Sequence, residues 1–215
     1  MLAALERTNR FLERPLEMTP RVLLVTAALL LVPALVVPLW TMTMFAPQYP
    51  DGLRLYIHAD RLVGGNRDQD IKEINVLNHY IGMRDLSTAD FTEFKWMPFV
   101  LGGIGLLLLR AAVLGKTSKL VDVLVIYCYF GAFSLWSFAG KMYRYGHELA
   151  PTASVKVEPF MPPLFGYEKL ANFEVYSYPA LGSYLLFAVA GLLLGALWLD
   201  WRAARVGPGG GERPS

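Results

Sequence analysis

Four side chains of this sequence are the candidate ligands of a soft metal ion: His79, Met83, His147 and Met161. His79 and Met83 are four residues apart, so they reach a common ion if one helix continues through Gly82. An imidazole together with soft thioether ligands favours Cu(I). The spacing therefore predicts a copper site centred on His79 and Met83, and at least one more ligand must come from elsewhere in the chain.

The preferred additional ligand is His147, which follows Gly146 at the end of an apolar helix, where the geometry of a ligand can be held rigidly. Met161 is the other candidate. It lies in the Pro-rich run 159–166, which favours a stiff extended segment.

Asn75 and Asn78 share the predicted helix face of His79, so either amide can orient the imidazole by accepting its second N–H. A different interpretation stays open, in which His79 stabilises the C-terminus of the helix and both asparagines bond to loop backbone. The remaining histidine, His58, lies in an alternating strand pattern and is expected to be a surface or hydrogen-bonded residue.

Composition and motifs exclude several classes of site. The formal net charge of +2 gives no basic surface for nucleic acid. A single cysteine, Cys128, excludes an intrachain disulfide and a cysteine-ligated iron–sulfur cluster. All three histidines lie outside the apolar runs, so no haem held by two intramembrane histidines is expected. No phosphate-binding or dinucleotide motif occurs, so no nucleotide is expected either.

The elements that position these residues belong to a membrane protein. Hydrophobic residues make up 54% of the 215 residues and charged residues 18%, which is too apolar for an ordinary soluble domain. A helix that rises about 1.5 Å per residue needs about 20 apolar residues to cross about 30 Å of hydrocarbon. The runs that meet this need are 22–40, 96–115, 123–140 and 175–199. The rest of the chain comprises an amphipathic segment (1–21), two long segments (41–95 and 141–174), a loop (116–122) and a tail expected to be disordered (200–215).

The distribution of Lys and Arg predicts the orientation. The two termini and the 110–120 connection, with Arg110, Lys116 and Lys119, carry a denser set of Lys and Arg than the two long segments, which places both termini in the cytoplasm. Asp122 and Asp200 then lie at the cytoplasmic ends of spans, where each is expected to be a solvated flanking residue.

The two long segments are expected to form an ordered cap outside the cytoplasm. Residues 41–46 and 53–59 alternate as strands do, and turn residues lie between them. Residues 68–81 show helical spacing of apolar side chains, and Gly82 is a natural stop. The predicted fold class is therefore an all-α membrane protein of four transmembrane helices, with a small α+β cap formed by the two long loops.

Four stretches carry a resemblance: Ala46–Leu53, Glu73–Met83, Tyr145–Leu149 and Pro162–Gly166. They resemble a family of small polytopic bacterial membrane proteins encoded beside nitrous oxide reductase and its copper-supplying accessory proteins. The positions that match the pattern of the family are Asn75, Asn78, His79, Tyr80, Gly82, Met83, Gly146 and His147. The resemblance implies a multi-pass protein of the bacterial inner membrane that faces the periplasm and helps to assemble or serve a copper enzyme.

Two functional hypotheses follow. In the first, the chain is an accessory protein that binds Cu(I) and passes it to a periplasmic copper protein or another accessory factor. In the second, it is a structural or docking subunit of a membrane complex and holds no metal. An enzyme is not expected, because no catalytic set is visible. The lipid bilayer is the one partner common to both hypotheses, and the oligomeric state stays open.

Overall fold

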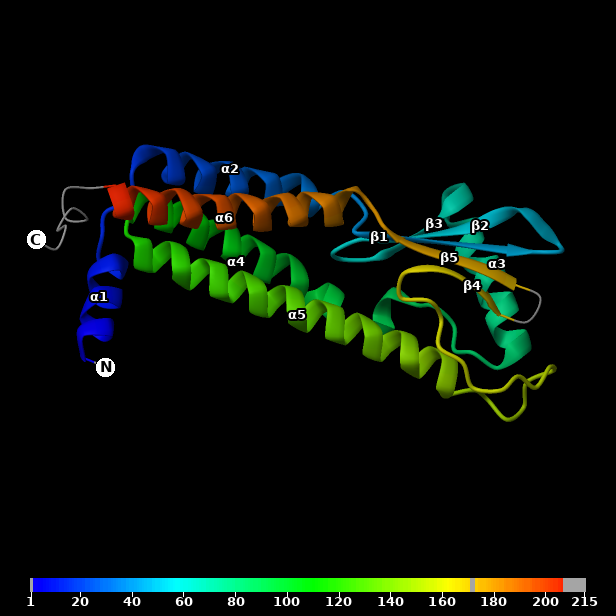
Figure 1. Ribbon diagram of the computed structural model, residues 1–215. Helices are drawn as coiled ribbons and strands as arrows, with labels where there is room; N and C mark the ends of the chain where they lie inside the picture. Colours follow the sequence, from blue (N-terminus) through cyan, green and yellow to red (C-terminus); the bar gives the residue numbers. More distant parts are fainter. Residues whose placement is uncertain (1, 171–172, 207–215) are drawn as a thin grey trace, which may run out of the picture. The chain divides into compact units, whose positions relative to one another are not determined.

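The computed structural model describes residues 2–170 and 173–206, and the chain divides into two compact units. Among the described residues, the helical unit comprises 2–32, 100–130 and 185–206, and the sheet unit comprises 33–99, 131–170 and 173–184. The helices are α1 (Leu2–Leu12), α2 (Met18–Ala34), α3 (Gly65–Ile81), α4 (Glu93–Leu114), α5 (Thr117–His147) and α6 (Leu181–Val206), with a short 3-10 helix at Thr88–Asp90 (Figure 1). The strands are β1 (Trp40–Ala46), β2 (Tyr49–Ile57), β3 (Leu62–Gly64), β4 (Gly166–Leu170) and β5 (Phe173–Pro179).

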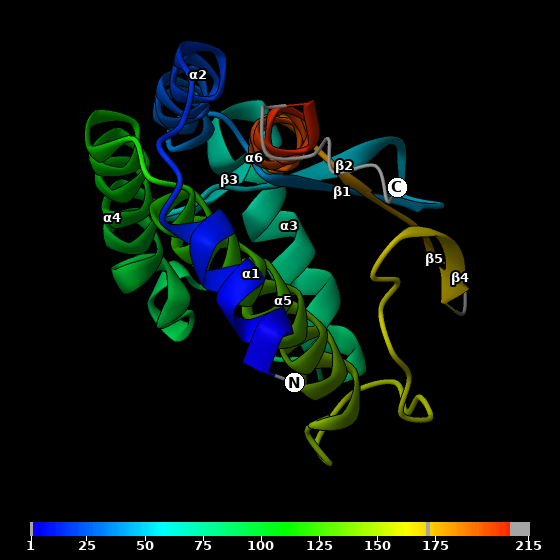
Figure 2. The same cartoon turned by 60° about the vertical axis from the view of Figure 1, so that its left-hand side comes forward.

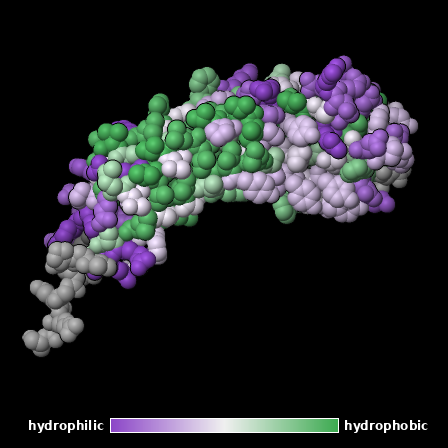
Figure 3. All heavy atoms as spheres, turned by 90° about the horizontal axis from the view of Figure 1, so that it is seen from above, coloured by the Kyte–Doolittle hydropathy of each residue, from purple (hydrophilic) through white to green (hydrophobic). Residues whose placement is uncertain are grey.

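In the helical unit, α2 packs with parts of α4, α5 and α6 around a core of aliphatic side chains. The largest fully buried of these are Leu24, Leu101, Ile104, Leu108, Leu120 and Leu193. The outward-facing side chains are apolar as well: Val22, Leu29, Val32, Leu106, Val113 and Leu194 are 55 to 79% exposed. Figure 3 shows apolar side chains gathered over α2 and α6. Helices that are apolar on every side are those that lie in a membrane.

Three helices of the described residues are long and apolar enough to cross a membrane: α4, α5 and α6. The chain is therefore a membrane protein that combines long apolar helices with a small antiparallel sheet. The fourth apolar helix, α2, has 17 residues and is shorter than the predicted run 22–40.

The first predicted span extends too far toward the C-terminus. Its helix ends at Ala34, because Pro38 lacks an N–H and disfavours helical geometry at the residue before it. The N–H groups of Val36 and Val37 both bond to the Pro33 carbonyl, and β1 begins at Trp40.

The fourth predicted span begins too early. Residues 173–179 form β5, and α6 starts only at Leu181. Side chains with strand alternation, such as Val175 and Tyr176, are uncharged too, so the absence of charge did not distinguish strand from span. At its other end α6 continues to Val206, so the first residues of the predicted tail 200–215 are helical, and residues 207–215 lie outside the described residues.

The second and third spans are present with longer helices. The predicted loop 116–122 is wrong, because α5 already begins at Thr117. The connection between α4 and α5 is only Gly115 and Lys116, and Gly115 has φ +58, which favours glycine.

The predicted amphipathic segment 1–21 forms α1 only over Leu2–Leu12, because α2 already begins at Met18. Within the helical unit, α1 runs across the axes of α2 and α6 rather than along them (Figure 1, Figure 2). Its Phe11 lines a groove with residues of α6: Leu194, Leu197, Trp198 and Trp201.

The sheet unit is built on a five-stranded antiparallel sheet of order β3-β2-β1-β5-β4. The strand predicted at 41–46 is present as β1. The strand predicted at 53–59 is present as β2 with different bounds, since β2 begins at Tyr49 and ends at Ile57, and the turn before it is only Pro47 and Gln48. β4 and β5 were not predicted. The pairing of β1 with β5, for example Met42 opposite Ser177, joins residues of both long segments in one sheet.

One face of the sheet, the inner face, packs on α3 and on residues of α4 and α5. The buried cluster comprises Leu53, Leu55, Leu62, Ile74, Leu77, Phe91, Phe94 and Tyr145. The helix predicted at 68–81 is present as α3, and it ends as predicted because Gly82 adopts φ +82 and its N–H bonds to helix carbonyls.

Candidate functional site

The predicted copper site depends on α3 continuing through Gly82, and it does not. The left-handed Gly82 ends the helix, and the Met83 N–H bonds back to the Asn78 carbonyl. Met83 therefore leaves the helix and packs, partly buried, against the core of the sheet unit. The helical spacing that was to bring Met83 and His79 to one ion is absent.

Asn75 and Asn78 bond to loop backbone rather than to an imidazole. Asn75 Oδ1 accepts from the Leu86 N–H at 2.7 Å, and its Nδ2 donates to the Leu86 carbonyl at 3.2 Å. The buried Asn78 donates from Nδ2 to the Arg84 carbonyl at 3.4 Å. The alternative interpretation, in which both asparagines bond to loop backbone, is therefore confirmed, and a role for either amide in orienting His79 beside a bound ion stays a prediction.

The predicted ligands lie on three neighbouring segments of the sheet unit. The end of α3 contacts the segment after α5 through two backbone bonds, Ala150 N–H to the Gly82 carbonyl at 2.8 Å and Val155 N–H to the Tyr80 carbonyl at 3.1 Å. An ion pair of 3.3 Å between Arg84 and Glu148 joins the same two regions.

The imidazoles themselves differ in their surroundings. His79 is exposed on α3. His147 stacks on the Tyr143 ring with 3.8 Å between centroids, and its Nδ1 lies 3.0 Å from the Tyr143 carbonyl oxygen. Met161 is 36% exposed, and His58 is hydrogen-bonded through Nδ1 to the Val36 carbonyl, as predicted for that residue. Across residues 2–170 and 173–206, no three His, Cys, Asp or Glu side chains are grouped to hold a metal ion; copper binding stays a prediction.

The face of the sheet opposite α3 carries a different set of side chains, which we call the outer sheet face. Strand register places Thr41, Thr43, Phe45, Arg54, Tyr56, Tyr167, Lys169, Glu174, Tyr176 and Tyr178 on it, and Phe165 joins them just before β4. Alternate residues of the same strands, such as Leu55 and Val175, are at most 5% exposed on the inner face. Period-two alternation therefore separates a dry core face from an open one.

The aromatic rings of the outer sheet face contact one another across strands. Phe165 and Tyr178 lie edge to face at 5.4 Å between centroids, Tyr167 and Tyr176 are 4.9 Å apart, and Phe45 meets the edge of Tyr176 at 5.7 Å. Phe165, Tyr167 and Tyr178 nevertheless stay 68, 49 and 41% exposed. The cluster is therefore ordered by its own contacts and remains open on its outer side.

Hydrogen bonds and neighbouring charges shift the pKa values of three polar groups near this sheet. Tyr49 donates a hydrogen bond to Glu73, and Gln69 Nε2 donates to the other carboxylate oxygen at 3.0 Å. The bond from Tyr49, with that from Gln69, lowers the pKa of Glu73, and the same bond raises the pKa of Tyr49. Partial burial and the neighbouring Glu174 raise the pKa of Tyr167 above its ordinary value.

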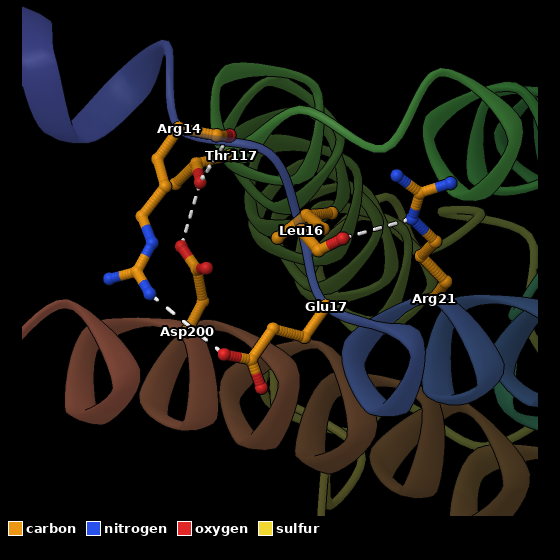
Figure 4. A network of polar contacts seen from close by, with 6 residues as sticks. All are labelled: Arg14, Leu16, Glu17, Arg21, Thr117 and Asp200. Carbon is orange, nitrogen blue, oxygen red and sulfur yellow. Dashed lines mark hydrogen bonds and ion pairs between the residues drawn. The ribbon is translucent and has the colours of Figure 1, made fainter. Parts of the chain in front are cut away.

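A second polar network lies in the helical unit (Figure 4). Thr117 Oγ1 donates to Asp200 Oδ2 at 2.7 Å, and the Thr117 N–H bonds to the Arg14 carbonyl at 3.1 Å. Arg21 Nε donates to the Leu16 carbonyl at 3.1 Å. Asp200 is 1% exposed, so its predicted role as a solvated flank is wrong. The network links the segment after α1 to the start of α5 and to α6.

Comparisons with protein-family models, with curated proteins and with solved structures found no match to this chain. The resemblance to the family encoded beside nitrous oxide reductase therefore stays a prediction. The function has to be inferred from the geometry of the chain itself.

Sequence reasoning missed the outer sheet face. One signal was present: residues 173–178 read Phe-Glu-Val-Tyr-Ser-Tyr, with aromatic and β-branched residues in strand alternation. The pairing that brings these residues beside β1 is not readable from a single sequence.

Proposed function

We propose that this protein is a membrane-anchored docking subunit, and that its outer sheet face binds a partner protein. The observation that carries the proposal is the ordered, open aromatic cluster of Phe45, Phe165, Tyr167, Tyr176 and Tyr178. Tyrosine and phenylalanine are enriched at protein interfaces, because each ring contributes a large contact area at a small cost in conformational entropy.

The charges on the outer sheet face favour a protein over a lipid surface as the partner. Arg54, Lys169 and Glu174 lie among the aromatic rings, so both signs of charge are present. A surface that binds the anionic headgroups of a membrane is enriched in Lys and Arg and avoids carboxylates. Mixed charge around aromatic anchors is the arrangement of a protein interface.

The edge of the sheet offers a second means of attachment. Strand β4 pairs with β5 on one side, and among the described strands its other edge is unpaired. An exposed edge strand can accept a strand from another chain through main-chain hydrogen bonds. Tyr167 and Lys169 on β4 lie beside that edge and extend the aromatic cluster to it.

We also propose that α2 is a fourth span, which places both termini on one side, in the cytoplasm, and the sheet in the periplasm. Its 17 residues correspond to about 25 Å, the lower end of what a span requires. Support comes from its exposed side, where Val22, Leu29 and Val32 are 55 to 63% exposed and would be costly in water.

The resemblance then indicates which partners to test first: a periplasmic copper enzyme and its accessory proteins.

Site-specific photocrosslinking in intact cells tests the docking proposal. A benzophenone amino acid replaces Tyr167 or Tyr178 on the outer sheet face, and Val76 in the control. Val76 is apolar and 63% exposed, so it is at least as accessible as the two tyrosines. It lies on α3 and not on the outer sheet face. We expect the same discrete protein adduct from both tyrosine positions and none from Val76.

Two results would count against docking. One is crosslinking to lipid alone from both tyrosine positions, which would make the outer sheet face a membrane-contact surface. The other is an identical adduct from all three positions, which would show contact without a preferred face. Lys169→Glu reverses one charge of the interface and should reduce the yield of the specific adduct at least about fivefold.

Copper handling is the second candidate, and one observation favours it. The backbone bonds and the Arg84–Glu148 ion pair bring the end of α3, which bears His79, next to the end of α5, which bears His147. If these histidines bind Cu(I), His79→Ala and His147→Ala should each weaken binding at least about tenfold, or about 1.4 kcal/mol. Wild-type protein that binds no Cu(I) above a detergent blank would reject this candidate and leave the docking proposal untouched.

A further inference from the structure

A groove lies between α4 and α5 at the end of the helical hairpin that they form. Its volume is about 410 Å³, and it is lined by Leu107, Arg110, Ala111, Lys119, Asp122, Val123, Val125 and Ile126. All of these residues belong to the helical unit. The tight connection at Gly115 and Lys116 brings the last turn of α4 close to the first turn of α5, so the charged residues lie at one end of the groove.

The charges in the groove leave one cation without a counterion. Lys119 Nζ and Asp122 Oδ2 are 2.8 Å apart, so these two charges largely neutralise each other. Arg110 is exposed, and among the described residues its guanidinium has no hydrogen-bond or ion-pair partner. A guanidinium presents a planar fork of donors that matches phosphate oxygens.

The apolar part of the groove restricts what the occupant can be. Leu107, Val123 and Ile126 lie on two helices that are long and apolar enough to cross a membrane, so lipid chains are the material in contact with them. An Arg within a turn of a helix end can extend its guanidinium to the headgroup level while its stem stays among the apolar side chains. The lining therefore presents an apolar channel that ends in a net positive charge.

We propose that this groove binds one anionic phospholipid, with its phosphate at Arg110 and Lys119 and an acyl chain along Leu107, Val123 and Ile126. Arg110, Lys119 and Asp122 together have a net charge of +1, which complements the single negative charge of a phosphodiester. A zwitterionic lipid brings a cation that cancels this attraction. Basic pockets between membrane helices are a recurrent form of headgroup site.

Lipid titration of the full-length protein in a neutral detergent, followed by native mass spectrometry, tests the proposal. The probes are phosphatidylglycerol and phosphatidylcholine with the same acyl chains. We expect the first phosphatidylglycerol to bind at least about fivefold more tightly than phosphatidylcholine, and Arg110→Gln to abolish most of this preference. Lys116→Gln is the matched control, because Lys116 has the same charge at the same end of the hairpin but does not line the groove.

Two further variants keep the test decisive if Arg110→Gln does not fold. Asp122→Asn frees Lys119 from its ion pair and should strengthen phosphatidylglycerol binding about two- to fivefold. Ile126→Trp fills the apolar part of the groove and should weaken the binding of both lipids together.

Equal binding of the two lipids to wild-type protein, or equal losses in Arg110→Gln and Lys116→Gln, would overturn the proposal. Displacement of phosphatidylglycerol by millimolar inorganic phosphate would instead identify a free-anion site and also reject the lipid assignment.

Discussion

The approach of Gly146 to the backbone of residue 160 gives the sharpest test of how the sheet unit is held together. Gly146 lies near the end of α5, its carbonyl accepts from the Phe160 N–H at 3.1 Å, and a Cβ built on it would lie 1.8 Å from the Phe160 carbonyl oxygen. An ordinary carbon–oxygen contact is about 3.3 Å, so Gly146→Ala requires a displacement of roughly 1.5 Å. A backbone carbonyl cannot rotate away as a side chain would, so the segment that contains Phe160 must move away from α5.

The magnitude follows from two losses. Separation of the backbones removes one hydrogen bond, about 0.5 to 1.5 kcal/mol, and the added methyl group overpacks the contact by about 1 to 3 kcal/mol. Undocking of the segment should therefore become about 1.5 to 4.5 kcal/mol easier, and even about 1.5 kcal/mol raises the undocked population about twelvefold. The gain in helix propensity from Gly to Ala does not offset this change, because α5 stays helical in both states.

Limited trypsin digestion of the folded protein in detergent measures this population. Lys156 is exposed in the segment between α5 and β4, and cleavage there requires the segment to open locally. We expect cleavage after Lys156 to be at least about tenfold faster in Gly146→Ala. Gly140→Ala is the matched control in the same helix, because a Cβ built there meets no atom within 4 Å beyond its chain neighbours and the adjacent backbone of α5, and its cleavage rate should equal that of wild type. Equal rates for Gly146→Ala and wild type would show that the segment is not held against α5.

Three further predictions concern single polar groups. Asn75→Ala should loosen the loop after α3 by about 1 to 3 kcal/mol, seen as faster hydrogen exchange of the Leu86 amide, while Asn75→Asp keeps the acceptor and should retain most of the protection. Thr117→Val leaves the buried carboxylate of α6 without its hydroxyl donor and should destabilise the helical unit by about 1 to 3 kcal/mol in thermal unfolding, whereas Thr117→Ser should be close to wild type. The pKa of Glu73 is lowered in the folded state, so its contribution to stability is present above its ordinary value of 4.5 and is lost as pH falls through the folded pKa. Tyr49→Phe removes the main cause, so its thermal midpoint should lie below that of wild type at pH 6 and converge with it as pH falls toward 3; a constant difference would contradict the assignment.

Local patterns predicted the elements that local physics determines. α3 was predictable because Ile71, Ile74 and Leu77 recur at helical spacing and Gly82 favours the left-handed end that the helix adopts. The first two strands were predictable from alternation and from Pro47 at the turn. Helix length and the absence of charge were sufficient for three helices that could span a membrane.

Non-local pairing was the part that could not be predicted. β5 reads as the beginning of a span, since Val175 to Pro179 carry no charge, and only its hydrogen bonds to β1 show that it is a strand. The copper hypothesis depended on Met83 staying in register with His79. One backbone conformation, the positive φ of Gly82, changed that register by ending the helix. The same glycine was predicted as a helix stop, so the two predictions were in conflict.

The construction of the outer sheet face determines how docking and folding are linked. Phe45 lies on β1, whereas Tyr176 and Tyr178 lie on β5, so the aromatic cluster exists only while these two strands are paired. A partner that binds the cluster therefore binds the paired state alone. At a free concentration of 100 times its Kd, it stabilises that pairing by about 2.7 kcal/mol. Copper at His79 and His147 would instead stabilise the contact between the ends of α3 and α5. The two candidate functions consequently predict protection from hydrogen exchange in different places: the backbone amides of β1 and β5 for a docked partner, and those of Ala150 and Val155 for bound copper.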